Sequence, residues 1–411
     1  MVKGVLLFSI FLFSAAFCLA EEQLPKKIVS SVRIKGNRYT KSIVILREML
    51  TKPGDVLNEE SLKKDRNRIK NLGLFADVKV YTKSLFSDSI GVVVEVKETF
   101  YWFPFPAISW SEETGWSYGG GIALTNFRGM NQQLLFMLLW GGERALSFNF
   151  KQPWSPGHPI TYEIAVERGT RKRKYEGFKE TNWFLKGDLG KYLKENLKAK
   201  ISLGIQQVES DSAGKTISYK NRDRFFLLEG EADFDTRDLN ENPSHGWHNS
   251  LSMEIDQGFD PVFYLITTAV DLRRYQPIFF PGHVLALNLK AVLQLGSVPA
   301  YKHQYAGGIY SLRGWDYASF IGNNLLITSM EYRIPILKYE ARRLAFIKSL
   351  NYGLTGVLFA DVGGVWDGPT TALRTGEGFG LAILLPLINV LRLDYAYGEC
   401  WQFHIYGGWR F

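Results

Sequence analysis

The segment LKAKISLGIQ, residues 197–206, alternates apolar and polar side chains with a period of two. Because successive side chains of a strand point to opposite faces, its apolar residues share one face: Leu197, Ala199, Ile201, Leu203 and Ile205. The segment LALNLKAVLQL, residues 285–295, repeats the alternation. A helix would spread these apolar residues around its axis, so both segments are predicted to be strands with one apolar and one polar face.

Sixteen alternating stretches of this kind follow one another towards residue 411. They cover roughly 103–111, 116–126, 131–140, 144–152, 159–168, 181–189, 196–208, 221–234, 246–257, 263–275, 282–295, 323–334, 351–361, 373–385, 389–398 and 401–411. Aromatic residues gather near their ends, at Trp140, Tyr162, Trp183, Tyr264, Tyr397, Trp401 and Trp409. An even number of long strands with aromatic ends is typical of an antiparallel transmembrane β-barrel with a polar lumen. A soluble β-sandwich would also alternate and is the alternative.

The first residues of the sequence have a different pattern. Lys3 precedes an apolar run from Val5 to Phe17, and Cys18-Leu19-Ala20 then forms a small-x-small cleavage site. Residues 1–20 are therefore predicted to be a secretory signal peptide, since the run is too short to span a membrane as a helix. A membrane anchor is the alternative. Cleavage would leave Cys400 as the single cysteine, so we expect no internal disulfide.

Residues 24–98 mix helix and strand patterns and predict a small α+β domain. The segment IVSSVRIKGN, residues 28–37, is a strand that ends in a Gly-Asn turn, and Thr40 is placed to cap a following helix. Residues 58–75 then present apolar side chains on one helical face, and two alternating strands close the domain. The order is β-α-α-β-β, and residues 99–411 are left for the barrel.

Several motifs resemble the BamA/TamA superfamily of outer-membrane assembly and translocation barrels. The first domain is similar to a POTRA module in Gly36-Asn37, Arg47, Gly54, Leu57, Leu62, Asp65, Leu72, Gly73-Leu74-Phe75 and the closing VVVEVKE. The barrel is similar in YGGGIALTNFRGMNQQL, DTRDLNENPSHGW, GGIYSLRGWDY, MEYRIPI, LFADVGGVW, LRLDYAYG and WQFHIYGGWRF. The resemblance implies a single POTRA domain in the periplasm of a bacterium and a barrel of sixteen strands in its outer membrane.

The resemblance also assigns a role to YSLRGWDYASF, residues 310–320, in the longest outer loop. It implies that the loop folds back into the lumen and that Arg313 contacts acidic residues of the inner wall. Asp361 and Glu331 are the candidate partners, because a guanidinium binds a carboxylate with two parallel hydrogen bonds. Gly314 would allow a close backbone approach, and Trp315 would pack against the wall.

Two further groups of residues are assigned to the ends of the barrel. Five residues are predicted to share one face of the last strand, as the signal that outer-membrane barrels present for their own assembly: Trp401, Phe403, Ile405, Trp409 and Phe411. Four residues are predicted to weaken the seam between strands one and sixteen, since proline lacks a backbone donor and glycine loosens pairing: Pro104, Pro106, Gly407 and Gly408.

We find no catalytic constellation in the sequence. The segment SAGKT, residues 212–216, matches the tail of a phosphate-binding loop, but Glu209 stands where the loop requires glycine. His245 and His248 lie in a turn-like segment without metal-ligand spacing. We therefore expect neither an enzyme, nor a cofactor, nor a metal. The net charge of +8 is assigned to solvated loops and to contact with anionic outer-membrane lipids rather than to nucleic acid.

The resemblance implies a protein that inserts or translocates polypeptides at the outer membrane without nucleotide. Its POTRA domain would capture unfolded or secreted clients by adding a strand to an exposed sheet edge. Periplasmic chaperones or lipoproteins are further expected partners. The alternative is a passive or lipid-conducting channel, since a barrel of this width leaves a lumen. A surface enzyme or adhesin is a third class, and the missing catalytic cluster argues against the enzyme.

Overall fold

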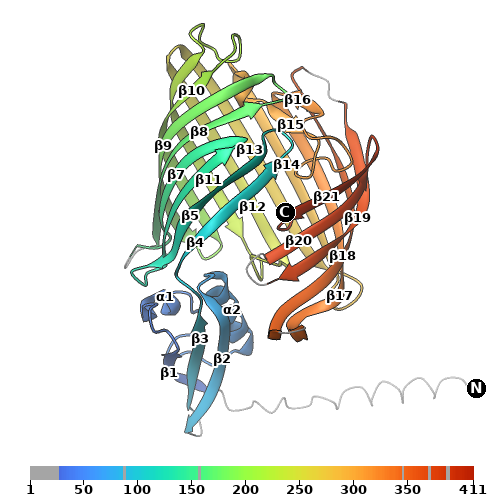
Figure 1. Ribbon diagram of the computed structural model, residues 1–411. Helices are drawn as coiled ribbons and strands as arrows, with labels where there is room; N and C mark the ends of the chain where they lie inside the picture. Colours follow the sequence, from blue (N-terminus) through green and yellow to red (C-terminus); the bar gives the residue numbers. More distant parts are fainter. Residues whose placement is uncertain (1–26, 87–88, 156–158, 345–346, 369–371, 386–388) are drawn as a thin grey trace, which may run out of the picture.

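The computed structural model describes residues 27–86, 89–155, 159–344, 347–368, 372–385 and 389–411. The signal peptide predicted at 1–20 lies outside these residues. The described chain forms a small α+β domain followed by a large curved sheet (Figure 1). No helix in the described ranges has the length and apolarity that crossing a membrane requires.

The small domain has the predicted β-α-α-β-β order. Its elements are β1 (Ile28–Lys35), α1 (Ser42–Leu46), α2 (Glu59–Asn71), β2 (Phe75–Phe86) and β3 (Ser89–Glu98). The strands form a sheet in the order β1-β3-β2, in which β1 is parallel and β2 antiparallel to β3. The apolar faces of both helices cover this sheet, and Val44, Ile45 and Ile69 are fully buried in its core.

The helix starts show where side-chain capping operates. Asn58 caps α2, because its side chain accepts hydrogen bonds from the backbone N–H groups of Glu60 and Ser61. The predicted capping role of Thr40 is wrong: α1 follows Lys41 and has no side-chain cap. The Thr40 hydroxyl instead accepts a hydrogen bond of 2.9 Å from the Asn126 amide of the large sheet.

The small domain docks against the large sheet through the segment around Thr40. The Tyr39 ring stacks on Tyr101, with centroids 4.0 Å apart. The Glu98 carboxylate accepts hydrogen bonds from the backbone N–H groups of Arg38, Tyr39 and Thr40 at 3.1, 3.1 and 2.6 Å. One carboxylate therefore shapes the loop through which the small domain contacts the large sheet.

The large sheet has sixteen antiparallel strands in sequence order, as predicted. Its first nine strands are β4 (Trp102–Ser111), β5 (Gly115–Phe127), β6 (Gln132–Gly141), β7 (Glu143–Gln152), β8 (Ile160–Arg173), β9 (Phe178–Lys194), β10 (Leu197–Ser210), β11 (Arg222–Asp235) and β12 (Gly246–Asp260). The others are β13 (Val262–Pro277), β14 (Val284–Gly296), β17 (Asn324–Leu344), β18 (Ile347–Trp366), β19 (Arg374–Leu385), β20 (Asn389–Tyr397) and β21 (Trp401–Gly407). Each described strand overlaps its predicted stretch, and β17 and β18 run further than predicted.

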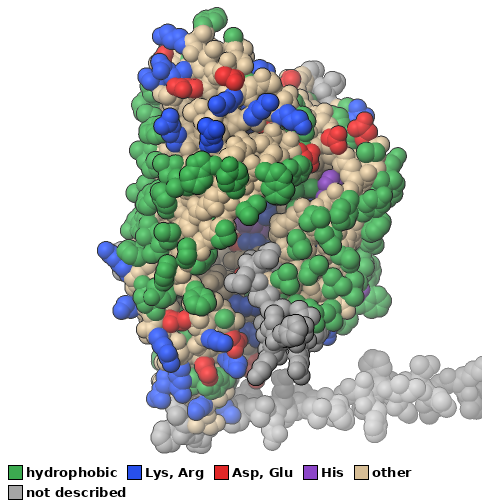
Figure 2. Space-filling view, viewed as in Figure 1, with side chains coloured by type: hydrophobic (Ala, Val, Ile, Leu, Met, Phe, Trp, Pro, Cys, Tyr) green, Lys and Arg blue, Asp and Glu red, His purple; other side chains and the backbone are tan. Residues whose placement is uncertain are grey.

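The two faces of the sheet follow the period-two pattern. On β10, Ile201 and Leu203 are exposed on the outer face, whereas Ser202 between them is buried on the inner face. Figure 2 shows apolar side chains over the outer surface of the curved sheet and charged side chains concentrated towards its upper end. The outer face therefore offers an apolar surface to lipid, and the inner face encloses polar groups.

The curved sheet is not closed. Its terminal strands are β4 and β21, and neither pairs with the other in the part of the chain that the structure describes. The seam therefore lies between the first and last strands of the sheet, as predicted. It is an interruption of the backbone hydrogen bonding rather than a weakly paired ladder.

The seam residues differ from the prediction in detail. The β4–β5 ladder runs through Pro104 and Pro106 without a register shift, so the two prolines leave the pairing of β4 with β5 intact. Backbone N–H groups two residues apart point to the same side of a strand, which indicates that both missing donors face the unpaired edge. Gly407 is the last residue of β21, and Gly408 lies beyond the strand rather than within it.

Candidate functional site

The long loop between β14 and β17, residues 297–323, returns into the space that the sheet encloses (Figure 1). It contains a short 3-10 helix, η1 (Ala300–Lys302), and the small strand pair β15 (Gln304–Ala306) and β16 (Phe320–Gly322). Leu312 and Arg313 near its tip are fully buried. A cation without solvent contact must find its partners on the inner wall.

Arg313 meets three carboxylates of the inner wall. Its Nε and Nη2 donate to the two oxygens of Asp361 on β18, at 2.8 and 2.9 Å. Its Nη1 donates to Glu331 on β17 at 2.9 Å and to Asp394 on β20 at 3.2 Å. The guanidinium also lies over the Phe359 ring, 3.5 Å from its centroid. The two parallel bonds to Asp361 fix the orientation of the guanidinium as well as its position.

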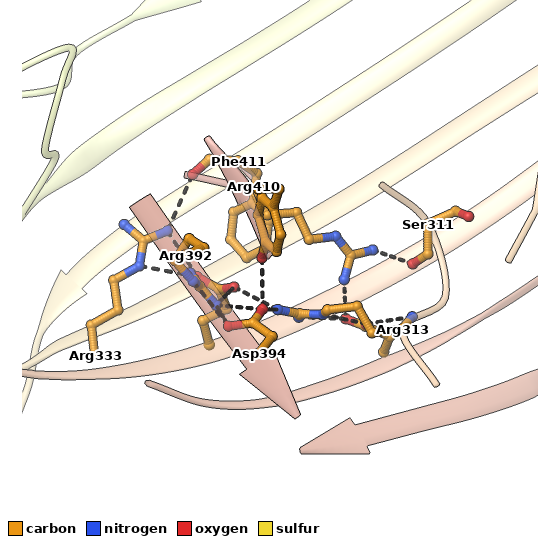
Figure 3. A network of polar contacts seen from close by, with 10 residues as sticks. Ser311, Arg313, Arg333, Arg392, Asp394, Arg410 and Phe411 are labelled. Atoms are coloured by element: carbon orange, nitrogen blue, oxygen red, sulfur yellow. Dashed lines mark hydrogen bonds and ion pairs between the residues drawn. The ribbon is translucent and has the colours of Figure 1, made fainter. Parts of the chain in front are cut away.

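Three further arginines complete the cluster (Figure 3). Arg333 donates to Glu331 at 3.0 Å, and Arg392 donates to Glu331 at 3.2 Å and to Asp394 at 2.9 Å. Arg410 forms an ion pair with Asp361 and donates to the Ser311 backbone carbonyl. The four arginines therefore share three buried carboxylates. Each carboxylate has at least two cationic partners, which offsets the cost of removing its charge from water.

The strands present these side chains inward because of their alternation. Glu331 and Arg333 are two residues apart on β17, and Arg392 and Asp394 are two residues apart on β20. Side chains two apart share a face, so each pair points into the lumen together. The Tyr406 hydroxyl of β21 adds a hydrogen bond of 2.6 Å to Asp394.

The loop backbone reaches the wall through glycine. Gly314 has a φ of +84°, and a Cβ there would lie 2.4 Å from the Gly398 nitrogen. On β19, a Cβ at Gly376 would lie 2.0 Å from the Arg313 carbonyl oxygen. The Trp315 indole N–H donates to the Thr375 carbonyl at 2.8 Å. The close approach of the two backbones near Arg313 therefore requires glycine both on the loop, at Gly314, and on the wall, at Gly376.

A second anchor holds the first half of the loop to the opposite strands. Lys302 forms ion pairs with Glu254 and Asp256 of β12, at 2.8 and 2.9 Å. The Tyr301 hydroxyl donates to Asp223 of β11 at 2.8 Å, and Arg173 of β8 donates to the Tyr301 carbonyl at 3.0 Å. The loop therefore crosses the lumen and is attached both to β8, β11 and β12 and to β17, β18 and β20.

The comparisons with known proteins agree with this architecture. An Omp85 superfamily domain model matches residues 126–411, and a POTRA model, described as a surface antigen variable number repeat, matches residues 27–99. The Omp85 model spans more than half of the chain. The chain belongs to the Omp85 superfamily.

Solved structures show the same fold at low identity. BamA from Haemophilus ducreyi lacking POTRA domains 1–3 is 17% identical, with a TM-score of 0.61 over 93% of this chain and 84% of that chain. CdiB from Escherichia coli is 12% identical, with a TM-score of 0.57 over 93% of this chain and 75% of that chain. The Omp85 and POTRA matches make this Omp85 protein a bacterial outer-membrane barrel preceded by a POTRA domain in the periplasm.

The structure of the Omp85 barrel brings Arg313, Asp361 and Glu331 together, as the sequence predicted. It adds Asp394 and three arginines that sequence reasoning missed. The signal for Arg392 and Asp394 was present in LRLDYAYG, where both occupy the polar face of an alternating strand. Arg410 has the same signal, since in a strand over residues 401–411 it lies on the face opposite Trp409 and Phe411, although the structure places it beyond the end of β21.

The last residues of the sequence contradict the prediction of a shared face. Trp401, Phe403 and Ile405 are exposed on the outer face, but Phe411 is only 6% exposed. Gly408 has a φ of +88°, and the chain turns inward after it. Trp409 then lies against Arg333, and Phe411 packs with Tyr275, Val284 and Ala286 inside the barrel. The physical reason is that these contacts hold the end of the chain inside the barrel, and Gly408 permits the positive φ that the turn requires.

Proposed function

We propose that this Omp85 barrel inserts or translocates polypeptides at the outer membrane without nucleotide. The observation that carries the proposal is the seam, where β4 and β21 each pair with one neighbour and leave the other edge unpaired among the described strands. A terminal strand presents a row of unpaired N–H and C=O groups, which is a template for another extended chain. In a bilayer these groups have no water to bind, so an incoming strand satisfies them favourably.

The POTRA domain offers a second template on the periplasmic side. Its sheet order places β1 and β2 at the edges; β2 pairs only with β3, whereas β1 also forms backbone hydrogen bonds with residues 54–57. An unfolded client would add a strand to one of these edges, where main-chain hydrogen bonds give affinity without sequence specificity. Chaperones and lipoproteins of the periplasm would deliver clients to this edge. The proposed mechanism uses hydrogen-bond exchange and no catalytic residue.

A passive or lipid-conducting channel is less well supported. The loop crosses the lumen between Lys302 at one wall and Arg313 at the other, and both cations are held by ion pairs. A conducting lumen would require at least one of these anchors to release. A plain channel would also require neither a POTRA domain nor an unpaired seam.

Reconstitution into liposomes tests the proposal. The purified protein is placed in vesicles, and an unfolded outer-membrane barrel is added with a periplasmic chaperone. We expect the client to become protease-resistant and heat-modifiable faster than in empty vesicles, with no added nucleotide. Depletion in cells should lower a defined set of outer-membrane or secreted proteins. Ion or lipid flux without any effect on polypeptides would instead support the channel.

A further inference from the structure

Two neighbouring residues of the lumen loop contact both edges of the unpaired seam. The outer end of the seam lies where β4 ends at Ser111 and β21 begins at Trp401. Asp316 of the loop contacts the β21 side, and Tyr317 contacts the β4 side. The Cα atoms of consecutive residues lie about 3.8 Å apart. Two adjacent loop residues therefore link β21 to the β4–β5 hairpin, although β4 and β21 share no backbone hydrogen bonds in the described structure.

The β4 side is held by Tyr317 alone among the loop residues with described hydrogen bonds to this hairpin. Its backbone N–H donates to Glu112 at 3.2 Å, and its hydroxyl donates to Glu113 at 3.3 Å. Both acids lie in the turn between β4 and β5. The edge strand is therefore tied to the loop by one main-chain and one side-chain hydrogen bond.

The β21 side is held by several contacts. Gln402 donates to Asp316 at 2.6 Å, and the Glu399 N–H donates to the Gly314 carbonyl at 2.9 Å. The buried pairing of Arg313 with Asp361 anchors the same stretch of loop to the neighbouring wall. Breaking any one of these contacts leaves the others in place, so residues 313–316 of the loop stay attached to the β17–β21 wall.

We infer that Tyr317 is a releasable latch, which holds the β4–β5 hairpin to the loop and keeps the outer end of the seam together. Among the described residues, the loop makes no equivalent hydrogen bond at the inner end, where residues 408–411 turn into the lumen. The seam then opens from the periplasmic end first and separates fully only when Tyr317 leaves Glu112 and Glu113.

The environment of Glu113 favours a latch that can release. Glu113 is 8% exposed, and its Oε1 is buried without a hydrogen bond in the described structure. A buried carboxylate oxygen without a donor is costly, so docking the hairpin tip carries an unfavourable contribution. With Tyr317 bound, Glu113 therefore accepts one hydrogen bond of 3.3 Å and keeps a buried oxygen without a donor. Each carboxylate that binds Arg313, by contrast, has at least two cationic partners.

Distance measurements between spin labels test the latch in the intact protein. In a Cys400→Ser background, one label pair at Ser109 and Phe403 reports the outer end, and a pair at Phe103 and Ile405 reports the inner end. We expect a narrow outer distribution and a broader inner one. Glu112→Ala/Glu113→Ala should shift the outer distribution to longer distances by several ångströms, whereas Gln402→Ala should change it much less.

Two further variants make the outcome decisive. Tyr317→Phe removes only the hydroxyl donor and should give a smaller shift in the same direction, even if the double variant folds poorly. Glu399→Ala is the matched control, because it removes a nearby carboxylate but keeps the backbone N–H that binds Gly314. An unchanged outer distance in both Tyr317→Phe and the double variant would overturn the latch. The measurement uses no client, so its outcome is independent of the proposed function.

Discussion

A guanidinium can serve three carboxylates at once, and an ammonium group cannot do so in the same geometry. Arg313 uses Nε, Nη1 and Nη2 to reach Asp361, Glu331 and Asp394 while its flat face covers Phe359. Its planar fork matches a carboxylate with two parallel bonds, whereas lysine offers a single compact charge. The loop tip is therefore held by geometry as well as by charge.

Replacing Arg313 tests this account at the residue scale. Arg313→Ala leaves Asp361 with only Arg410 among its described ion pairs, and removing one partner of a buried pair costs about 3–5 kcal/mol. We expect a lower unfolding midpoint in urea and reduced client handling, with the barrel still inserted. Arg313→Lys should rescue only part of the loss.

Lys172→Ala, at an exposed cation of β8, is the matched control for Arg313. It should leave the midpoint unchanged. Equal midpoints for Arg313→Ala and Lys172→Ala would show that the buried cluster does not hold the loop.

Glu98 makes the docking loop of the POTRA domain dependent on pH. Partial burial opposes its ionisation, but hydrogen bonds from Thr40, Tyr39 and Arg38 outweigh that effect and lower the pKa of Glu98. A lowered pKa in the folded state adds stability above the unfolded pKa of about 4.3. This contribution is lost as the pH falls through the folded value.

We expect the POTRA domain of Glu98→Gln to melt earlier than the wild type at pH 7, with a difference that shrinks as the pH falls below the unfolded pKa of about 4.3. Circular dichroism of the full-length protein at a series of pH values measures this. Glu95→Gln changes an exposed acid of the same strand and should follow the wild type throughout. A constant difference between Glu98→Gln and wild type at every pH would contradict the titration of Glu98.

At the scale of the element, β21 and the residues that follow it place aromatic side chains in two different surroundings. Phe403 is 62% exposed on the outer face, whereas Phe411 is 6% exposed and packs inside. The turn at Gly408 separates the two, so an aromatic on the strand and an aromatic beyond it serve different purposes. Outer-face aromatics meet lipid, and Phe411 fills a space beside Tyr275.

These two phenylalanines give a matched pair of variants. Phe411→Ala empties a buried site, and such a truncation costs about 3–5 kcal/mol in a well-packed core. We expect it to lower the temperature at which the purified barrel loses its heat-modifiable form. Phe403→Ala should leave that temperature nearly unchanged. If the two variants lower it equally, residues 408–411 do not pack inside the folded barrel as described.

At the scale of the whole molecule, the unpaired seam is the feature that an assembly mechanism requires. A closed barrel would have no free edge, and an isolated open sheet would expose one along its full length. Here the latch at Tyr317 and the anchored loop limit the opening to one place, between β4 and β21. The POTRA domain stands on the side where, by our inference, the seam opens first.

A disulfide across the seam should stop client handling. One cysteine is placed within residues 107–111 of β4 and one within residues 403–407 of β21, in a Cys400→Ser background. We expect the oxidised protein to be folded but inactive in the liposome assay, and reduction to restore activity.

The control for the seam disulfide joins Thr170 and Thr181, whose hydroxyls lie 3.2 Å apart on the paired strands β8 and β9. That crosslink should not affect activity. Full activity of the oxidised seam variant would contradict opening between β4 and β21. It would favour a route through the lumen or the surrounding lipid.

Local patterns in the sequence determine the strands and their faces. The alternation in LKAKISLGIQ and LALNLKAVLQL requires only that side chains two apart share a face, and sixteen strands follow from repeating that rule. The acids of the inner wall are also visible locally, since Glu331 and Asp394 occupy polar positions of alternating strands. Arg313 was found through the resemblance of its loop to a known family.

The tertiary structure decides what local patterns cannot contain. Whether β4 pairs with β21 depends on the curvature summed over sixteen strands, and no single segment encodes it. The inward turn at Gly408 depends on what lies opposite, because Phe411 enters the barrel only where Tyr275, Val284 and Ala286 leave room for it. Glycine permits both the extended and the turned chain, so the contacts made after the turn, rather than the glycine, select the path.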